Sequence, residues 1–205
     1  MTWKESDHPR GAAGKFRPNR RPAPSFSLSD DSDTAAALTV PQMGAKLTAC
    51  WVSILEMSAW PVDGWTLVGG QMVLLHGLLN GILPPRLSED VDVVVDVRVI
   101  PPPLGVFARM LADHGYEPHV SRDSVAHRWE REGVRVDLVA TEGTGPRTDL
   151  RTVGPFKTIA IEGSTQAVRR SGKVLTRLPE RRLEERVPLP SRKHSGVSEG
   201  LKDSG

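Results

Sequence analysis

A run of valines interrupted by aspartates constrains the fold of this chain more than any other feature. In residues 86–97, RLSEDVDVVVDV, Asp90, Asp92 and Asp96 share one parity, and valines occupy the alternate positions from 91 to 97. Side chains alternate between the two faces of a β-strand, so the run predicts a strand with one valine face and one acidic face. Asp96 lies about 20 Å along this strand from Asp90, and we expect it to be a solvated strand end.

Other hydrophobic periodicities place this strand in a layered fold. Apolar residues at helical spacing predict helices, and alternating or short apolar runs predict strands. Glu132-Gly133 is expected to form a tight hairpin. We expect helices at 42–60, 71–79 and 104–115, strands at 65–68, 90–97, 116–120, 125–132 and 134–140, and weaker elements at 156–163, 164–170 and 173–178. This order predicts an α/β (α+β) fold in which helices flank a mixed β-sheet.

The two ends of the chain differ in composition from its middle. Apolar residues make up 38% of the sequence, and its 19 glycines and 17 prolines are a high share. The ends are polar and show no hydrophobic period, so they cannot bury enough apolar surface to offset the entropy lost on ordering. We therefore predict a disordered tail at 1–41, a folded domain at 42–178 and a disordered basic tail at 179–205. The basic tail either approaches an anionic partner or is only solvated.

Cysteine content and hydropathy bear on the compartment. Cys50 is the single cysteine, which excludes an intramolecular disulfide and favours a reducing compartment, and its apolar neighbours predict a core position. The N-terminal residues contain no apolar signal-peptide region, and no apolar run approaches the length of a membrane span. We expect a cytoplasmic protein that does not associate with a membrane.

The acidic face of the predicted 90–97 strand carries the chemistry. Asp90 and Asp92 lie about 7 Å apart on it, and two carboxylates so close repel each other unless a cation compensates them. Mg²⁺ is such a cation, because it takes a few carboxylate oxygens and completes its octahedron with water and phosphate oxygens. Upstream, Gly69-Gly70 stands between a strand and a helix, where the backbone can approach a phosphate group. These features predict a site for Mg²⁺ and a triphosphate.

A third acid, Asp137, lies in the apolar run at 134–140. If that strand lies beside the 90–97 strand, Asp137 reaches the same site. Three carboxylates could then hold two metal ions that align an attacking hydroxyl with a leaving pyrophosphate, and the third acid could accept the hydroxyl proton. Alternatively, Asp137 is only a cross-strand partner of Arg128 or Arg135.

The other candidate residues also have structural explanations. The first two aspartates could form the exposed edge of an amphipathic strand, and Gly69-Gly70 could be a tight strand–helix junction. His76 lies on an apolar helix and is more typical of a hydrogen-bonded core histidine than of a catalytic base. Arg128 and Lys157 are candidates for phosphate contacts.

Together these motifs resemble the nucleotidyltransferase superfamily. The stretches LVGGQMVLLHG, PPRLSEDVDVVVD and VAHRWEREGVRVDLVA are similar to its signature, a Gly-Gly or Gly-Ser followed by an Asp-x-Asp strand and a later acidic strand. Within the superfamily, the Arg-x-Ser-x-Asp-x-Asp motif, the His-Gly and the HRW stretch resemble AbiEii-type (type IV toxin) and MNT-like proteins. The resemblance covers about residues 64–178.

The resemblance implies both an activity and a set of site residues. The activity is Mg²⁺-dependent transfer of an NMP from an NTP to a hydroxyl of an RNA such as tRNA or of a protein, in a type IV toxin–antitoxin pair with a cognate antitoxin or toxin protein. It implies catalytic and metal-binding roles for Asp90, Asp92 and Asp137 and nucleotide-binding roles for Gly69, Gly70, Arg86 and Ser88.

Two departures from the family pattern keep a second function open. The separation of Gly70 from Asp90, 19 residues, is longer than in compact forms of the signature, and the C-terminal helical region of longer members is not recognisable here. The alternative is a catalytically inactive module that binds a nucleotide or a partner protein. A third, weaker alternative is a truncated chain without a stable function.

Overall fold

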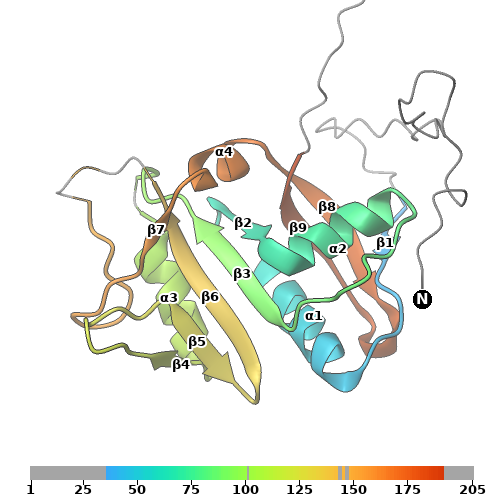
Figure 1. Ribbon diagram of the computed structural model, residues 1–205, viewed down its shortest axis with the longest axis horizontal. Helices are drawn as coiled ribbons and strands as arrows, with labels where there is room; N and C mark the ends of the chain where they lie inside the picture. The colour runs from blue at the N-terminus through green and yellow to red at the C-terminus, as the bar shows by residue number, and fades with distance from the viewer. Residues whose placement is uncertain (1–35, 101, 143–144, 146–147, 192–205) are drawn as a thin grey trace, which may run out of the picture.

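The computed structural model describes residues 36–191 apart from 101, 143–144 and 146–147. Helices and strands alternate in the first part of the chain, and most of the later elements are strands (Figure 1). In chain order the elements are β1 (Leu38–Thr39), α1 (Ala45–Ser58), β2 (Trp65–Val68), α2 (Gly69–Leu79), β3 (Asp90–Val95), α3 (Leu104–Asp113), β4 (Glu117–His119), β5 (Arg128–Arg131), β6 (Val134–Thr141), β7 (Ala160–Ile161), α4 (Ser164–Arg169), β8 (Ser171–Leu178), a 3₁₀ turn (Pro179–Arg181) and β9 (Leu183–Pro190).

The main sheet has six strands of mixed direction. Its order is β2-β3-β6-β5-β4, and β7 pairs with β6 beyond the residues that pair with β5. β3 and β6 are parallel, whereas β2 is antiparallel to β3 and β5 is antiparallel to β6. A second sheet contains β1, β8 and β9. The prediction of a mixed sheet flanked by helices is therefore confirmed.

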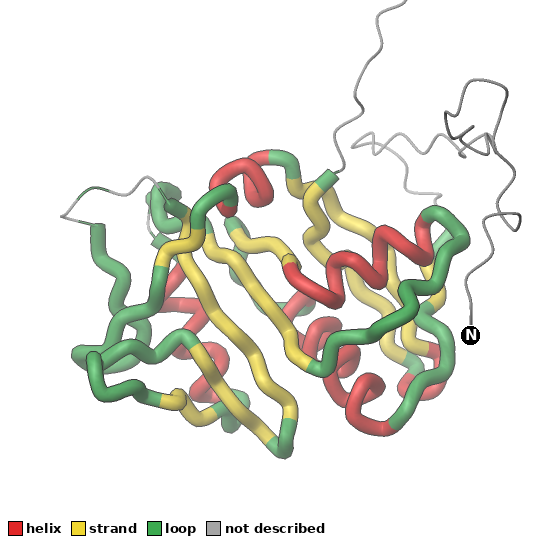
Figure 2. Tube along the Cα trace, viewed as in Figure 1, coloured by secondary structure: helices red, strands yellow, loops and turns green. Residues whose placement is uncertain are grey.

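The two faces of the main sheet have different environments. Val91, Val93 and Val95 are fully buried, in the same core as Trp51 of α1 and Phe107 of α3. Figures 1 and 2 show α3 behind β5 and β6, whereas no helix of the described residues crosses the near side of β6. The valine face thus builds the core, as predicted, and the opposite face of β6 carries both polar and apolar side chains, among them Asp137 and Val139.

Two local predictions are also confirmed. Glu132 and Gly133 both have positive φ, 51° and 78°, as a two-residue turn between antiparallel strands requires, and this turn joins β5 to β6. Cys50 is fully buried on α1. None of the helices in the described ranges is long and apolar enough to cross a membrane.

The predicted end of the folded domain at residue 178 is wrong. β9 lies within the predicted basic tail, yet it pairs with β8 along its whole length, and Val187 and Leu189 are fully buried. Leu183, Val187 and Leu189 share one face of the strand, the charged residues at 184 and 186 are exposed on the other, and residues 187–190 are buried on both faces. Pro188 fits because β9 is an edge strand, where a missing N–H group is tolerated.

The predicted N-terminal boundary at residue 41 is also wrong. Leu38 and Thr39 pair in parallel with β8, and Val40 is buried. The folded part therefore extends beyond 42–178 in both directions. The rest of the two predicted tails, residues 1–35 and 192–205, lies outside the described residues.

Leu189→Ala tests whether β9 belongs to the fold. We expect it to lower the free energy of unfolding by about 3 kcal/mol, because it removes a fully buried side chain and leaves a cavity. The measurement is urea denaturation at pH 7. Leu183→Ala, at the half-buried start of β9, is the matched control and should cost clearly less. Equal stability of the Leu189→Ala variant and the wild type would contradict the role of β9.

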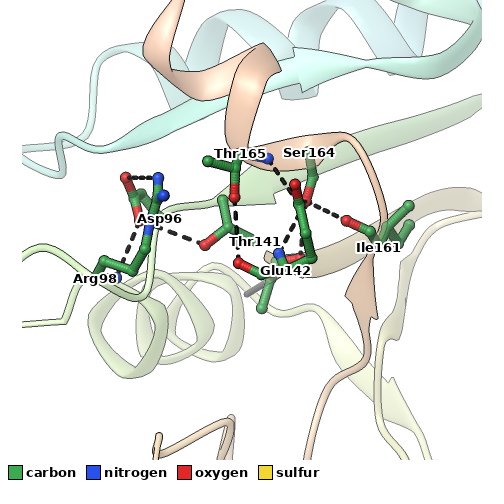
Figure 3. Close-up of polar contacts among 8 residues, drawn as sticks. Asp96, Arg98, Thr141, Glu142, Ile161, Ser164 and Thr165 are labelled. Carbon is green, nitrogen blue, oxygen red and sulfur yellow. Dashed lines mark hydrogen bonds and ion pairs between the residues drawn. The ribbon is translucent and has the colours of Figure 1, made fainter. Parts of the chain in front are cut away.

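A set of hydrogen bonds holds α4 against the end of β6 (Figure 3). The Glu142 carboxylate accepts hydrogen bonds from Ser164 Oγ at 2.6 Å and from the Thr165 N–H at 2.8 Å. Thr165 Oγ1 donates to the Glu142 carbonyl at 3.2 Å, and Ser164 Oγ also lies within hydrogen-bond distance of the Ile161 carbonyl. The hydrogen bonds from Ser164 and Thr165 lower the pKa of Glu142 to about 2.

This shift in pKa predicts how stability depends on pH. The folded chain loses the Glu142 proton at a lower pH than the unfolded chain, whose pKa is near 4.5, so the stabilisation is present above that value and is lost as the pH falls toward about 2. We expect Glu142→Gln to lower the melting temperature at pH 7, and the difference from wild type to shrink in acid. Thermal unfolding followed by circular dichroism measures this. Glu162→Gln makes the same change at an exposed position, is the control, and should leave the melting temperature at pH 7 unchanged.

Candidate active site

The register of β3 and β6 places the predicted acids on one face of the sheet. In this parallel pair Asp92 is opposite Asp137, and Asp90 is opposite Arg135. Directly opposed residues of neighbouring strands point to the same side, so the Asp92 and Asp137 carboxylates lie together on the face away from the valine core. We call Asp92 and Asp137 the pocket carboxylates.

A pocket of about 340 Å³ contains these two acids. Its size is within the range of small-molecule sites. One wall combines the acids with Gly69 at the start of α2, and the rest is mainly apolar. The lining residues are Val68, Gly69, Asp92, His127, Asp137, Val139, Ile159 and Ile161. The β2–α2 junction and two acidic strands, distant in the sequence, thus meet at one place.

The two glycines permit a close approach at this junction. Gly69 has φ of +62°, and a Cβ atom there would lie 1.9 Å from Asp92 Oδ2. A Cβ atom at Gly70 would lie 2.2 Å from the Ser88 Cβ. Gln71 Nε2 donates to the Ser88 carbonyl at 2.7 Å and ties the first turn of α2 to the loop before β3. Any larger residue at position 69 or 70 would therefore separate α2 from the acidic strand.

Asp92 lies in an environment that disfavours its charge. Burial raises its pKa, and so do the negative charges of Asp137 and Asp90, while Arg128 and a hydrogen bond from the Gly70 backbone oppose the shift. Within the described residues Asp92 has no direct ion pair. It is therefore the acid of this site that most needs a cation.

Arginines compensate the negative charges of Asp137 and Asp90. Arg128 donates from Nε and Nη2 to the two carboxylate oxygens of Asp137, both at 2.8 Å. Arg135 Nη1 lies 3.3 Å from Asp90 Oδ1. Both ion pairs join neighbouring strands, so the alternative of a cross-strand partner for Asp137 is realised in this structure by Arg128.

The remaining predicted site residues do not line the pocket. Ser88 supports the strand, because its Oγ accepts a hydrogen bond from the Asp90 N–H at 3.3 Å and its Cβ faces Gly70. Arg86 is exposed and forms no hydrogen bond or ion pair within the described ranges. Among the secondary candidates, His76 is buried on α2, and Lys157 is exposed in the segment before β7.

Asp96 is not the solvated strand end that we expected from the sequence. Only 9% of it is exposed, directly after β3. Arg98 Nε and Nη2 donate to its two oxygens at 2.8 Å, and Thr141 Oγ1 lies 3.4 Å from Oδ1 (Figure 3). The hydrogen bonds from Arg98 hold the pKa of Asp96 below its usual value. Asp96 therefore fixes the end of the strand.

His127 is a pocket residue that the sequence reasoning did not select for this site. It precedes the first residue of β5, and its carbonyl accepts a hydrogen bond from the Leu138 N–H at 2.7 Å. Its Nδ1 atom is buried and has no hydrogen-bond partner in the part of the chain that the structure describes. The only sequence signal for His127 was its position next to Arg128. That signal was misleading, because strict alternation along a strand places neighbouring residues on opposite faces.

Two of the three predicted acids, Asp92 and Asp137, are placed as Mg²⁺ ligands would be. No three His, Cys, Asp or Glu side chains of the described residues are grouped closely enough to hold a metal ion, so the structure does not bring the three predicted acids into one cluster. The pocket carboxylates remain as a pair, and Asp92 Oδ2 occupies the space that a side chain at position 69 would fill. Mg²⁺ usually takes one or two carboxylates and completes its shell with water and phosphate oxygens. Asp92 and Asp137 would be its protein ligands.

Fold and site together define a mixed α/β protein with a pair of carboxylates beside the N-terminus of a helix. Comparisons of the chain with models of protein families, with curated proteins and with solved structures find no match. The function must therefore be argued from the geometry of the pocket and from the motifs that form it.

Proposed function

We propose that this chain is a Mg²⁺-dependent nucleotidyltransferase that transfers an NMP from an NTP to a hydroxyl of an RNA, such as tRNA, or of a protein in the cytoplasm. One observation carries the proposal: Asp92 and Asp137, in register on parallel strands, share a pocket with Gly69 at the first turn of α2. A glycine turn, an Asp-x-Asp strand and a later acidic strand are the three parts of the superfamily signature, and here they adjoin one pocket.

Each part of the pocket has a role in such a reaction. Gly69 lets Asp92 lie against the start of α2, and the Gly70 N–H donates to Asp92. The other N–H groups of this first turn favour a negatively charged phosphate. Bound Mg²⁺ would neutralise charge that develops on the phosphate oxygens. The pocket carboxylates would hold the ion, and Asp90, two residues before Asp92 on β3, adds to the negative field at Asp92.

The transfer step balances without a further reactant. The acceptor hydroxyl oxygen forms a bond to the α-phosphorus, and the bond from that phosphorus to the β-phosphate bridging oxygen breaks. Pyrophosphate leaves with the electron pair of the broken bond. The hydroxyl proton passes to one of the pocket carboxylates, which act as general bases. A role in a toxin–antitoxin pair, with a cognate protein partner, follows from the resemblance alone.

A second candidate is a module that binds nucleotide without transferring it. Arg128 engages both oxygens of Asp137, and the described residues offer no three-acid cluster. Both features would be expected if catalysis had been lost while the pocket was retained.

Incubation with labelled NTPs separates the two candidates. The full chain is mixed with Mg²⁺, each α-labelled NTP in turn and total tRNA, and label is followed on both RNA and protein. Label that appears with the wild type and not with Asp92→Asn supports the transferase. Nucleotide binding without label transfer supports the module, and the absence of both contradicts either function.

A further inference from the structure

The ion pair between Arg128 and Asp137 differs from the other ion pair on this face. Both hydrogen bonds are 2.8 Å long and use both carboxylate oxygens, whereas Arg135 meets Asp90 through one contact of 3.3 Å. A bidentate pair of this kind is stronger and more directional than a single contact. Arg128 therefore occupies the oxygens of Asp137 that a metal ion would otherwise use.

Without a bound nucleotide, arginines compensate most of the negative charge on this face. Two arginines face the three acids, so only one net negative charge remains, and it is formally that of Asp92. A divalent cation without phosphate thus meets a site that is largely compensated. It would have to compete with a guanidinium for Asp137.

Arg128 is placed to change its partner. Its side chain is 38% exposed, so it is not locked in the core. A guanidinium group binds a phosphate through the same two-donor geometry that it uses for a carboxylate. A triphosphate in the pocket that contains Asp137 would lie within the same neighbourhood and would compete for Arg128.

We propose that Arg128 exchanges Asp137 for the triphosphate when the nucleotide binds, and so makes metal binding depend on the nucleotide. The inference rests on the proposed function, because it requires a site for a nucleotide and Mg²⁺. By linkage, the free energy that Arg128 adds to metal–nucleotide coupling is the same whichever ligand binds first. Arg128 is thus a phosphate-binding residue that also controls when Asp137 becomes available.

Binding of Mn²⁺, followed through the electron paramagnetic resonance signal of the free ion, tests the exchange without measuring activity. The full-length wild type, Arg128→Gln and Arg135→Gln are titrated with and without an α,β-methylene NTP. Without nucleotide, Arg128→Gln should bind Mn²⁺ about tenfold more tightly than the wild type, because the competitor is gone. Arg135→Gln is the matched control and should change this affinity by about twofold at most, since Arg135 pairs outside the pocket.

The nucleotide should abolish this difference in Mn²⁺ affinity between the wild type and Arg128→Gln. It is expected to tighten Mn²⁺ binding in the wild type about tenfold more than in Arg128→Gln. Arg128→Lys retains the charge but loses the two-donor fork, so it should fall between the two. If circular dichroism shows that Arg128→Gln is unfolded, the comparison of Arg128→Lys with the wild type tests the exchange instead.

Two outcomes overturn the inference and differ in what they say of the function. If all variants that fold bind free Mn²⁺ equally and still form the complex with nucleotide, the exchange is excluded and nucleotide binding stands. If neither the wild type nor any variant binds Mn²⁺ or nucleotide, the exchange and the proposed function both fail.

Discussion

Replacing Asp92 with asparagine is expected to reduce nucleotidyl transfer by about a thousandfold or more and, at the same time, to stabilise the metal-free protein. The loss is expected because asparagine keeps the shape of the side chain but removes the charge that holds Mg²⁺, which contributes several kcal/mol to the transition state. The gain is expected because the charged form of Asp92 is disfavoured by burial and by Asp137 and Asp90. We expect about 1 kcal/mol of added stability at pH 7.

The gain in stability should depend on pH. Because the pKa of Asp92 is higher in the folded chain than its ordinary value of 3.8, the folded chain holds this proton more tightly. The wild type therefore loses stability as the pH rises from about 4 through the folded pKa. The advantage of Asp92→Asn is largest at pH 7 and disappears below about pH 4. Urea denaturation in buffer with EDTA at both pH values measures the difference.

Two further aspartates provide controls. Asp113→Asn makes the same chemical change at an exposed position at the end of α3, on the other side of the sheet, and should affect neither transfer nor stability. Asp90→Asn removes a neighbouring charge on the same strand and should reduce transfer by about tenfold, less than Asp92→Asn. If Asp92→Asn lowered the stability at pH 7, Asp92 would be a structural residue and the assignment of the site would be wrong.

Gly69→Ala is expected to damage both the fold and the pocket. The new Cβ atom would lie 1.9 Å from Asp92 Oδ2, in a backbone with φ of +62° that disfavours any side chain. The positive φ and the steric conflict together should cost about 3 kcal/mol of stability. Any relaxation moves α2 away from Asp92, so nucleotide binding should weaken at least about tenfold. Denaturation and equilibrium binding of an α,β-methylene NTP measure the two effects.

A substitution at Gly81 separates the cost of the positive φ from the cost of the steric conflict with Asp92. It has a similar φ of +66°, but a Cβ atom there would meet nothing within 4 Å. Gly81→Ala should therefore cost only about 1 kcal/mol, the strain of the left-handed backbone, and should leave nucleotide binding unchanged. Equal losses in the two variants would show that the contact between Gly69 and Asp92 has no consequence.

Local sequence patterns determined most of the elements. Alternating valines identified β3 and its buried face, and the apolar patterns at 42–60 and 104–115 identified α1 and α3. Glu132-Gly133 identified the hairpin between β5 and β6. These predictions succeed because they depend on preferences within a few residues, which the chain carries into any fold.

The C-terminal strand shows where composition misleads. The segment at 179–190 is rich in charged residues, and this composition led us to predict a disordered tail. Val187 and Leu189 nevertheless fill one face of β9 against the rest of the fold, while the charged residues between Leu183 and Val187 lie mostly toward solvent. A two-residue period over a short strand was the missed signal.

The sequence by itself determined which residues can do chemistry here: two glycines before a helix, an Asp-x-Asp strand and one acid in a later strand. Only the tertiary structure decided their partners. It joined Asp92 with Asp137, paired Asp137 with Arg128, left Asp90 with Arg135 and brought His127 into the pocket. The physical reason is that a cross-strand neighbour depends on the register between segments far apart in the chain, and a shift by one residue would turn each of these side chains to the other face.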